Sequence, residues 1–169
     1  MHFTLNQSAK NLSLRVSFSL LLFSAFFLAP SLAMAATLAL SPSGGTYHKG
    51  QNFKVSVLVN SDISINAIYA VLAFPTKNIE VIALSKEKSI INLWIQDPSF
   101  SNSGNTGNVT FEGVALNPGF SGARGRVLDI TFRIKEEGSA NLNFLGLAIL
   151  ANDGLGTNVA SARDRKSVV

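Results

Sequence analysis

Few side chains in this chain have the types and spacing that catalysis requires. The 169-residue sequence has two histidines and no cysteine, which excludes thiol catalysis and cysteine-ligated metals. His48 stands beside Lys49 and Gly50 in a turn-like segment, and we predict a solvated turn residue there, not a general base. The Gly-x-Ser-x-Gly motif of serine hydrolases is absent from the sequence.

Asp97 and Glu112 are the nearest candidates for the two carboxylates of a glycosidase. Such a pair must lie roughly 5 to 10 Å apart across the scissile bond, and sequence spacing does not place these two at that separation. The chain is also short and lacks an insertion that would form a cleft. We therefore predict that the protein is not an enzyme and holds no cofactor.

One segment has a superficial likeness to a calcium loop. Asn152-Asp153-Gly154 lacks acidic ligands at alternate positions and the closing glutamate that such loops use. A tight turn is the better interpretation, because Asn, Asp and Gly all favour turn conformations. We predict no metal site.

The charge balance argues against nucleic acid as a partner. The sequence has 14 Lys and Arg against 10 Asp and Glu, a net charge of +4, and part of this excess lies in the N-terminal segment. Basic residues are otherwise interspersed with acids, apart from a short cluster of Arg163, Arg165 and Lys166. So small an excess of basic residues, spread among acidic ones, does not form the basic surface that nucleic-acid binding requires.

Most of the sequence alternates with a period of two, which is typical of β-strands. In Phe53–Asn60 the apolar positions are every second residue, and in Leu128–Ile134 the alternation places Asp129 toward water. We predict about nine strands, at 37–40, 53–60, 65–74, 79–84, 93–96, 108–112, 128–134, 139–144 and 147–150. Turn-forming segments separate them, and only 86–91 has a helical pattern, so we expect an all-β sandwich or barrel.

The N-terminal segment 1–35 reads as a secretory signal. Lys10 and Arg15 precede the apolar run 16–28, and the small residues at 33 and 35 predict cleavage between Ala35 and Ala36. An uncleaved membrane anchor is the rival interpretation, although serines interrupt the apolar run. We expect one domain at 36–160, a disordered basic tail at 161–169, and a secreted or cell-surface location. Membrane contact would come only through the signal segment or through a C-terminal anchor missing from this sequence.

Three segments carry motifs that occur in a fixed order along the chain. The segment 47–59 has a Gly-centred turn and a valine-rich strand, 65–84 has Phe74-Pro75 between two strands, and 107–134 has a Gly-rich loop between strands. In this succession they resemble the cohesin domains of bacterial extracellular proteins. The segment 93–100 together with 117–120 is similar to a divergent branch of secreted cohesin-like proteins. The resemblance implies a jelly-roll β-sandwich that acts as a protein-recognition module, with a dockerin-like module as its partner.

Cohesins bind dockerins through one sheet face, and the resemblance places that face on the strand 65–74. The outward positions there are apolar in this chain (Ala67, Tyr69, Val71 and Ala73), where the family has Asn and Asp, which puts dockerin specificity in doubt. This apolar stripe is either covered by a loop or neighbouring strand, or it is a docking patch. Thr110 and Glu112 on a neighbouring strand would extend the patch.

Two alternatives to protein recognition stay open. Trp94, with Phe100 and Phe120 near it in sequence, could stack on sugar rings. The chain would then be a polysaccharide-binding module that takes part in polysaccharide catabolism. Core packing is the simpler role for a single tryptophan. The chain could also be a structural spacer in a larger surface protein.

Overall fold

One long strand, β3 (Asn52–Pro75), belongs to both layers of the structure. Its first half pairs with β1 (Ala36–Ser41) and β7 (Phe120–Ile134). Its second half pairs with β6 (Thr106–Val114) and β8 (Ala140–Ala151). The computed structural model describes residues 35–161 and 165–168, and these contain strands and turns but no helix.

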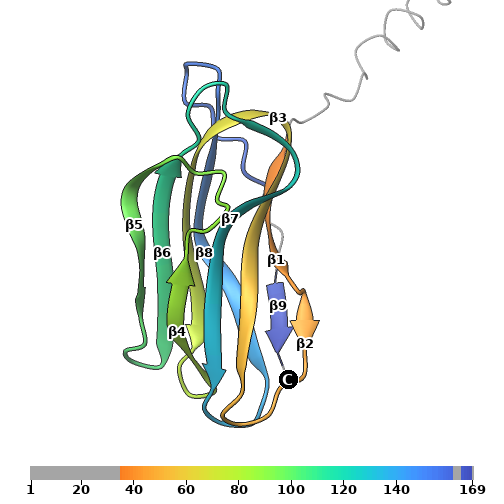
Figure 1. Cartoon of the computed structure of the whole chain (residues 1–169), viewed down its shortest axis with the longest axis vertical. Coiled ribbons are helices and arrows are strands. Elements are labelled where there is room, and N and C mark those ends of the chain that lie inside the picture. Colours follow the sequence, from red (N-terminus) through yellow and green to blue (C-terminus); the bar gives the residue numbers. More distant parts are fainter. Residues whose placement is uncertain (1–34, 162–164, 169) are drawn as a thin grey trace, which may run out of the picture. The chain divides into compact units, whose positions relative to one another are not determined.

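The remaining strands complete two layers around β3 (Figure 1). We use front layer and back layer as names only, independent of the view in Figure 1. The front layer has the order β2-β9-β8-β3-β6-β5, where β2 is Gly44–Gly45, β9 is Arg165–Val168 and β5 is Leu93–Ser101. The back layer has the order β1-β3-β7-β4, where β4 is Ile79–Ser85. The predicted jelly-roll β-sandwich is confirmed.

The core lies between the layers and is built from the inward set of the alternating residues. Phe53, Val55, Val57 and Val59 on β3 are all buried, as the alternation predicts. Aromatic rings fill the centre: Phe74 meets Phe132 edge-on with centroids 5.4 Å apart, and Phe132 stacks on Phe53. With no cysteine in the chain, this apolar burial is the main source of stability.

β3 was predicted as two strands, and that prediction is wrong. The pairing of β3 with β7 shifts register at Val57/Leu58, Val59/Ser61 and Ser61/Ile65, and in this stretch the side chains turn polar. Bulges of this kind disturb the alternation without ending the hydrogen-bonded ladder. β8 likewise joins the two segments predicted at 139–144 and 147–150, with a shift opposite Val71/Leu72.

Two further segments differ from expectation. The segment 86–91 is a turn, closed by Ser89 N–H donating to the Lys86 carbonyl at 3.1 Å, and is not helical. The tail at 161–169 was expected to be disordered; within it, Arg165–Val168 forms β9, which pairs antiparallel with β8 and parallel with β2. This strand is held by backbone hydrogen bonds, and its four residues show no alternation of apolar side chains from which a strand could have been predicted.

The predicted signal segment lies, apart from Ala35, outside the described residues. Ala36 begins β1 and is buried, with its N–H donating to the Val159 carbonyl at 2.8 Å. Across the described ranges, no helix has the length and apolar character needed to cross a membrane.

Candidate functional site

The outer surface of the β8-β3-β6-β5 sheet, here called the front face, gathers most of the residues predicted to bind a partner. Tyr69 on β3 lies between Glu112 on β6 and Ala148 on β8. Val71 lies two residues further along β3, between Thr110 and Gly146. Because directly paired residues point to the same side of a sheet, these side chains share one surface.

The front face is wider than the strand 65–74 and its β6 neighbour. The next row places Ala67 between Val114 and Leu150. On the far side of β6, Leu93 pairs with Val114 and Gln96 pairs with Glu112, so β5 extends the same surface. The sequence analysis missed the contributions of β5 and β8, because which strands lie side by side is not encoded in any local pattern.

Tyr69 is the most prominent aromatic group on this surface. Its side chain is 37% exposed, and Leu93 at the β5 edge is 49% exposed. The Tyr69 ring lies over Gly146 of β8, since a Cβ added at Gly146 would stand 3.3 Å from Cε1 of the ring. Among the described residues no loop or strand buries Tyr69 completely, so at this position the stripe stays open to solvent.

Ala73 is an exception within the predicted stripe. It is only 6% exposed, so of the two alternatives left open for the stripe the covered one applies at this position. Its methyl group lies between the longer side chains of its pair partners, Asn108 on β6 and Asn143 on β8. Ala67 and Val71 are half-buried, so Tyr69 carries most of the exposed apolar surface of the stripe.

Glu112 brings a negative charge into this apolar surface. It is half-buried and pairs across strands with Tyr69 on one side and Gln96 on the other. Within the described part of the chain its carboxylate forms no ion pair, because the four pairs there involve Asp129 twice, Asp97 and Glu80. A carboxylate that is partly desolvated and unpaired favours an incoming cation.

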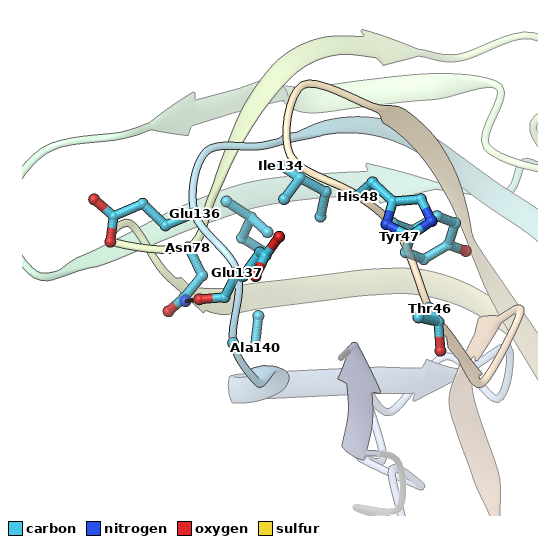
Figure 2. Close-up of a pocket in the computed structure, with 10 residues that line it drawn as sticks. Thr46, Tyr47, His48, Asn78, Ile134, Glu136, Glu137 and Ala140 are labelled. Carbon is cyan, nitrogen blue, oxygen red and sulfur yellow. Dashed lines mark hydrogen bonds between the residues drawn. The ribbon is translucent and has the colours of Figure 1, made fainter.

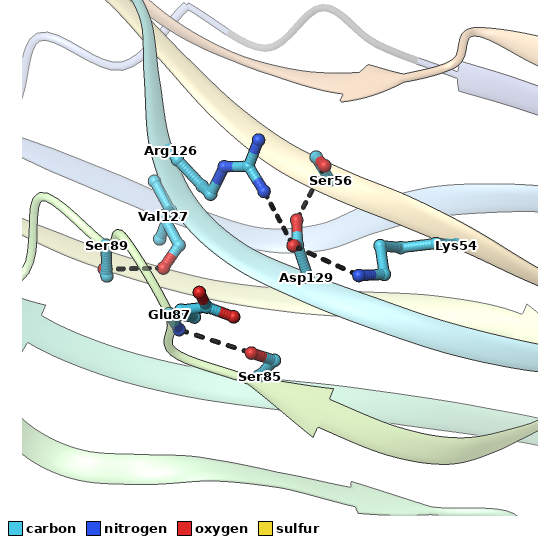
Figure 3. Close-up of polar contacts among 8 residues, drawn as sticks. All are labelled: Lys54, Ser56, Ser85, Glu87, Ser89, Arg126, Val127 and Asp129. Atoms are coloured by element: carbon cyan, nitrogen blue, oxygen red, sulfur yellow. Dashed lines mark hydrogen bonds and ion pairs between the residues drawn. The ribbon is translucent and has the colours of Figure 1, made fainter.

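The outer surface of the back layer, here called the back face, satisfies its own charges (Figure 3). Asp129 was predicted to face water, which is wrong: it is 4% exposed. Its carboxylate accepts hydrogen bonds from Ser56 Oγ at 2.6 Å and Arg126 Nη1 at 2.7 Å, with Lys54 Nζ at 3.9 Å. Nearby, Arg133 Nε donates to Glu80 at 2.7 Å. Internal pairing leaves the back face little to offer a charged partner.

The three aromatic residues considered for sugar stacking do not form one surface. Trp94 is half-buried, packs against the core and lies 5.9 Å below the ammonium of Lys86. Phe100 is 43% exposed but lies at the other end of β5. Phe120 lies on β7 and covers Gly125, where a Cβ would come within 2.7 Å of its Cε1. A planar polysaccharide would not meet all three rings.

The residues considered for catalysis and metal binding have separate local contacts. Asp97 on β5 follows Gln96, the cross-strand partner of Glu112, and its carboxylate forms an ion pair with Lys86 at 2.8 Å. His48 is exposed in the connection between β2 and β3, where Figure 2 shows its ring at the rim of a pocket. Asp153 caps its own turn, with Leu155 N–H donating to it at 2.8 Å. No cluster of three His, Cys, Asp or Glu groups occurs among the described residues.

No protein-family model and no curated protein matches this chain. Solved structures do match it. The solution structure of CaCohA2 from Clostridium acetobutylicum is 13% identical, with a TM-score of 0.63 over 81% of this chain and 91% of that one. A chain of the type I cohesin–dockerin complex Coh-OlpC-Doc435 from Clostridium thermocellum is 13% identical, with a TM-score of 0.62 over 83% and 96%.

A third similar structure comes from an archaeon. The non-cellulosomal cohesin of Archaeoglobus fulgidus is 22% identical, with a TM-score of 0.55 over 79% of this chain and 89% of that one. At identities this low the likeness is one of fold, and it spans nearly the whole length of each solved chain.

Proposed function

We propose that this chain, whose fold is that of a cohesin domain, is a non-catalytic protein-recognition module that captures a dockerin-type partner on its front face. The observation that carries the proposal is the contrast between the two outer faces. The front face has an exposed aromatic ring beside an unpaired carboxylate, whereas the back face pairs its charges internally.

The chemistry of the front face favours a protein over a sugar as partner. Apolar residues surround one charged group there, an arrangement typical of the centre and anchor positions of protein interfaces. The similar chain from Clostridium thermocellum belongs to a type I cohesin–dockerin complex, which supports the same partner class. The three aromatic residues considered for sugar stacking give that alternative little support, since Trp94 and Phe100 lie at opposite ends of β5 and Phe120 lies on β7 over Gly125.

The cohesin fold with apolar residues at 67, 69 and 71 suggests a partner that differs from the dockerins of cellulose-degrading complexes. A partner for this face would present an apolar ridge to Tyr69 and Val71 and a lysine or arginine to Glu112. The module would therefore select dockerin-type partners by shape and one charge pair, with few side-chain hydrogen bonds.

The experiment that tests this proposal is a footprint of the bound partner. A panel of purified dockerin modules would be screened for binding, and hydrogen exchange of the chain would be measured with and without a bound module. Protection confined to β3, β5, β6 and β8 at front-face positions is expected. Absence of binding to the whole panel would refute the dockerin class, and protection on β1, β4 and β7 would refute the front face.

Export from the cytoplasm is part of the same proposal. The signal-like segment 1–35 would direct secretion, and cleavage between Ala35 and Ala36 would release a domain that begins at β1. Mass spectrometry of the exported product would check this, with a mature N-terminus at Ala36 as the expected result. A product that keeps residues 1–35 and fractionates with membranes would favour the anchor.

A further inference from the structure

A pocket of about 360 Å³ lies where the strand ends of the two layers meet, away from the front-face residues. Its floor is apolar and consists of Ile79, Ile134 and Ala140, all of them buried. Its walls come from Thr46–His48, before β3, and from the turn Glu136–Gly138, between β7 and β8. This volume and apolar lining are within the range of small-ligand sites. We call it the end pocket.

The turn that forms one wall is fixed in place by Asn78. The N–H groups of Lys135 and Glu136 both donate to the Asn78 carbonyl, at 2.7 and 3.2 Å. The Asn78 side chain in turn donates through Nδ2 to the Glu137 carbonyl at 3.2 Å. Gly138 has φ 126°, and a Cβ there would stand 2.9 Å from Asn78 Nδ2, so a glycine is needed for this close approach.

The opposite wall is also held by specific contacts. The Tyr47 ring stacks on Phe53 with centroids 4.3 Å apart. The His48 N–H donates to Gln51 Oε1 at 2.8 Å, and the Gly50 N–H donates to the Ile134 carbonyl at 2.9 Å. The two walls are therefore preformed, which lowers the ordering cost of binding a ligand.

Two adjacent glutamates on the turn differ in direction. Figure 2 shows the Glu137 carboxylate turned toward the middle of the end pocket, in the direction of His48, whereas the Glu136 carboxylate turns away from it. Among the described residues neither carboxylate takes part in an ion pair. The end pocket thus combines an apolar floor with one carboxylate, that of Glu137, which points inward and can accept hydrogen bonds but not donate them.

We propose that the end pocket binds a primary alkylammonium group, such as the end of a lysine side chain. The methylene stem packs on Ile134, Ala140 and the Tyr47 ring, and the ammonium donates to the Glu137 carboxylate. A flexible apolar stem ending in a compact cation matches this combination of floor and charge. This site is separate from the front face, so its failure would leave the proposed partner docking untouched.

The test uses the folded domain and small probes. Nα-acetyl-lysine N-methylamide is titrated while the backbone amide shifts of His48 and Gly138 are followed by NMR, and saturable shifts are expected. The norleucine analogue, which has the same backbone and no ammonium, is expected to bind at least about tenfold more weakly, because hydrogen bonds to charged groups are the strong ones. Cadaverine is the third probe, and it shows whether the natural alkylammonium group belongs to a polypeptide or to a free polyamine. Tighter binding of the lysine amide assigns the site to polypeptides, and tighter binding of cadaverine assigns it to free polyamines.

The two glutamates provide a matched pair of variants. Glu137→Gln is expected to weaken lysine amide binding by about tenfold, and Glu136→Gln by less than about twofold, because only the first carboxylate points inward. Equal loss in both variants would overturn the proposal, since it would indicate general attraction to an acidic turn. Equal binding of the lysine and norleucine probes to the unmodified domain would also overturn it, whether or not the variants fold.

Discussion

Tyr69 and Glu112 are direct partners across the β3–β6 pair, so an exposed aromatic ring and an unpaired carboxylate stand next to each other on one sheet surface. The ring is not part of the core, and in the described residues the carboxylate compensates no cation. Both groups are therefore available to a binding partner.

Replacing Tyr69 with alanine should weaken partner capture. An aromatic ring at the centre of an interface commonly contributes at least about 1 kcal/mol, or roughly fivefold in affinity. Isothermal titration with a bound dockerin module would measure the loss. Leu155→Ala is the matched control, because Leu155 is 86% exposed on the loop after β8 and does not belong to the front face. Unchanged affinity in Tyr69→Ala would contradict the prediction.

Glu112→Gln should lower partner affinity and reduce its dependence on salt. The substitution keeps the size of the side chain and removes the charge that a partner cation would contact. Folding stability should stay within about 0.5 kcal/mol, because no described residue depends on this carboxylate. Titrations at low and high ionic strength would measure the effect, with Glu87→Gln on the loop after β4 as control. A salt dependence equal to that of the unmodified chain would refute the prediction.

Asp129→Ala should destabilise the domain by about 2 kcal/mol, since it removes a charged hydrogen bond from Arg126 and a second bond from Ser56. Urea unfolding of the purified domain would measure the change. Glu80→Ala should cost less than about 1 kcal/mol, because its partner Arg133 is half-exposed and solvent screens the pair. A larger loss in Glu80→Ala than in Asp129→Ala would reverse the expected order.

Gly107→Ala should destabilise the domain by about 1 to 3 kcal/mol through overpacking. A Cβ at Gly107 would collide with the buried ring of Phe74 and stand 2.7 Å from the Ser101 carbonyl oxygen. Thermal unfolding would measure the change, with the exposed neighbour Asn108→Ala as control, expected within about 0.5 kcal/mol. Equal melting temperatures for the two variants would contradict this packing.

The turn at Asp153 should contribute stability that depends on pH. The Thr157 hydroxyl and the Leu155 N–H donate to its carboxylate and hold the pKa of Asp153 below its ordinary value of 3.8. A lowered pKa stabilises the folded state above that ordinary value, and the contribution is lost as the pH falls through the folded pKa. The melting-temperature difference between the unmodified chain and Asp153→Ala should therefore be constant near neutral pH and shrink below 3.8. A difference that is independent of pH would contradict this.

The layers of the fold could be predicted from the sequence where one side of a strand faces the core. The every-second residues of β3 and β6 are buried as their alternation indicates: Phe53, Val55, Val57 and Val59, and Val109 with Phe111. The prediction failed where register shifts break the period: Val127 and Leu128 are adjacent and both buried, next to the shift opposite Val57/Leu58. Asp129 follows directly after them, and its burial depends on Arg126 and Ser56, partners that no local pattern reveals.

The candidate site was predicted in part. The stripe containing Tyr69 follows from counting back from Phe74, and the pairing of Tyr69 with Glu112 and Val71 with Thr110 agrees with the neighbouring strand chosen from the sequence. The end pocket could not be predicted, because its two walls, 46–48 and 136–138, are far apart in the chain and their approach is set by hydrogen bonds to the Asn78 and Ile134 carbonyls.

A strand that belongs to two layers has a mechanical consequence. β3 is one continuous strand, hydrogen-bonded to β1 and β7 along one half and to β6 and β8 along the other, so the two layers are joined by a single stretch of covalent backbone. A load applied to a captured partner on the front face would be transmitted through β3 into the back layer. The domain should therefore resist pulling as a single cooperative unit and rupture in one step.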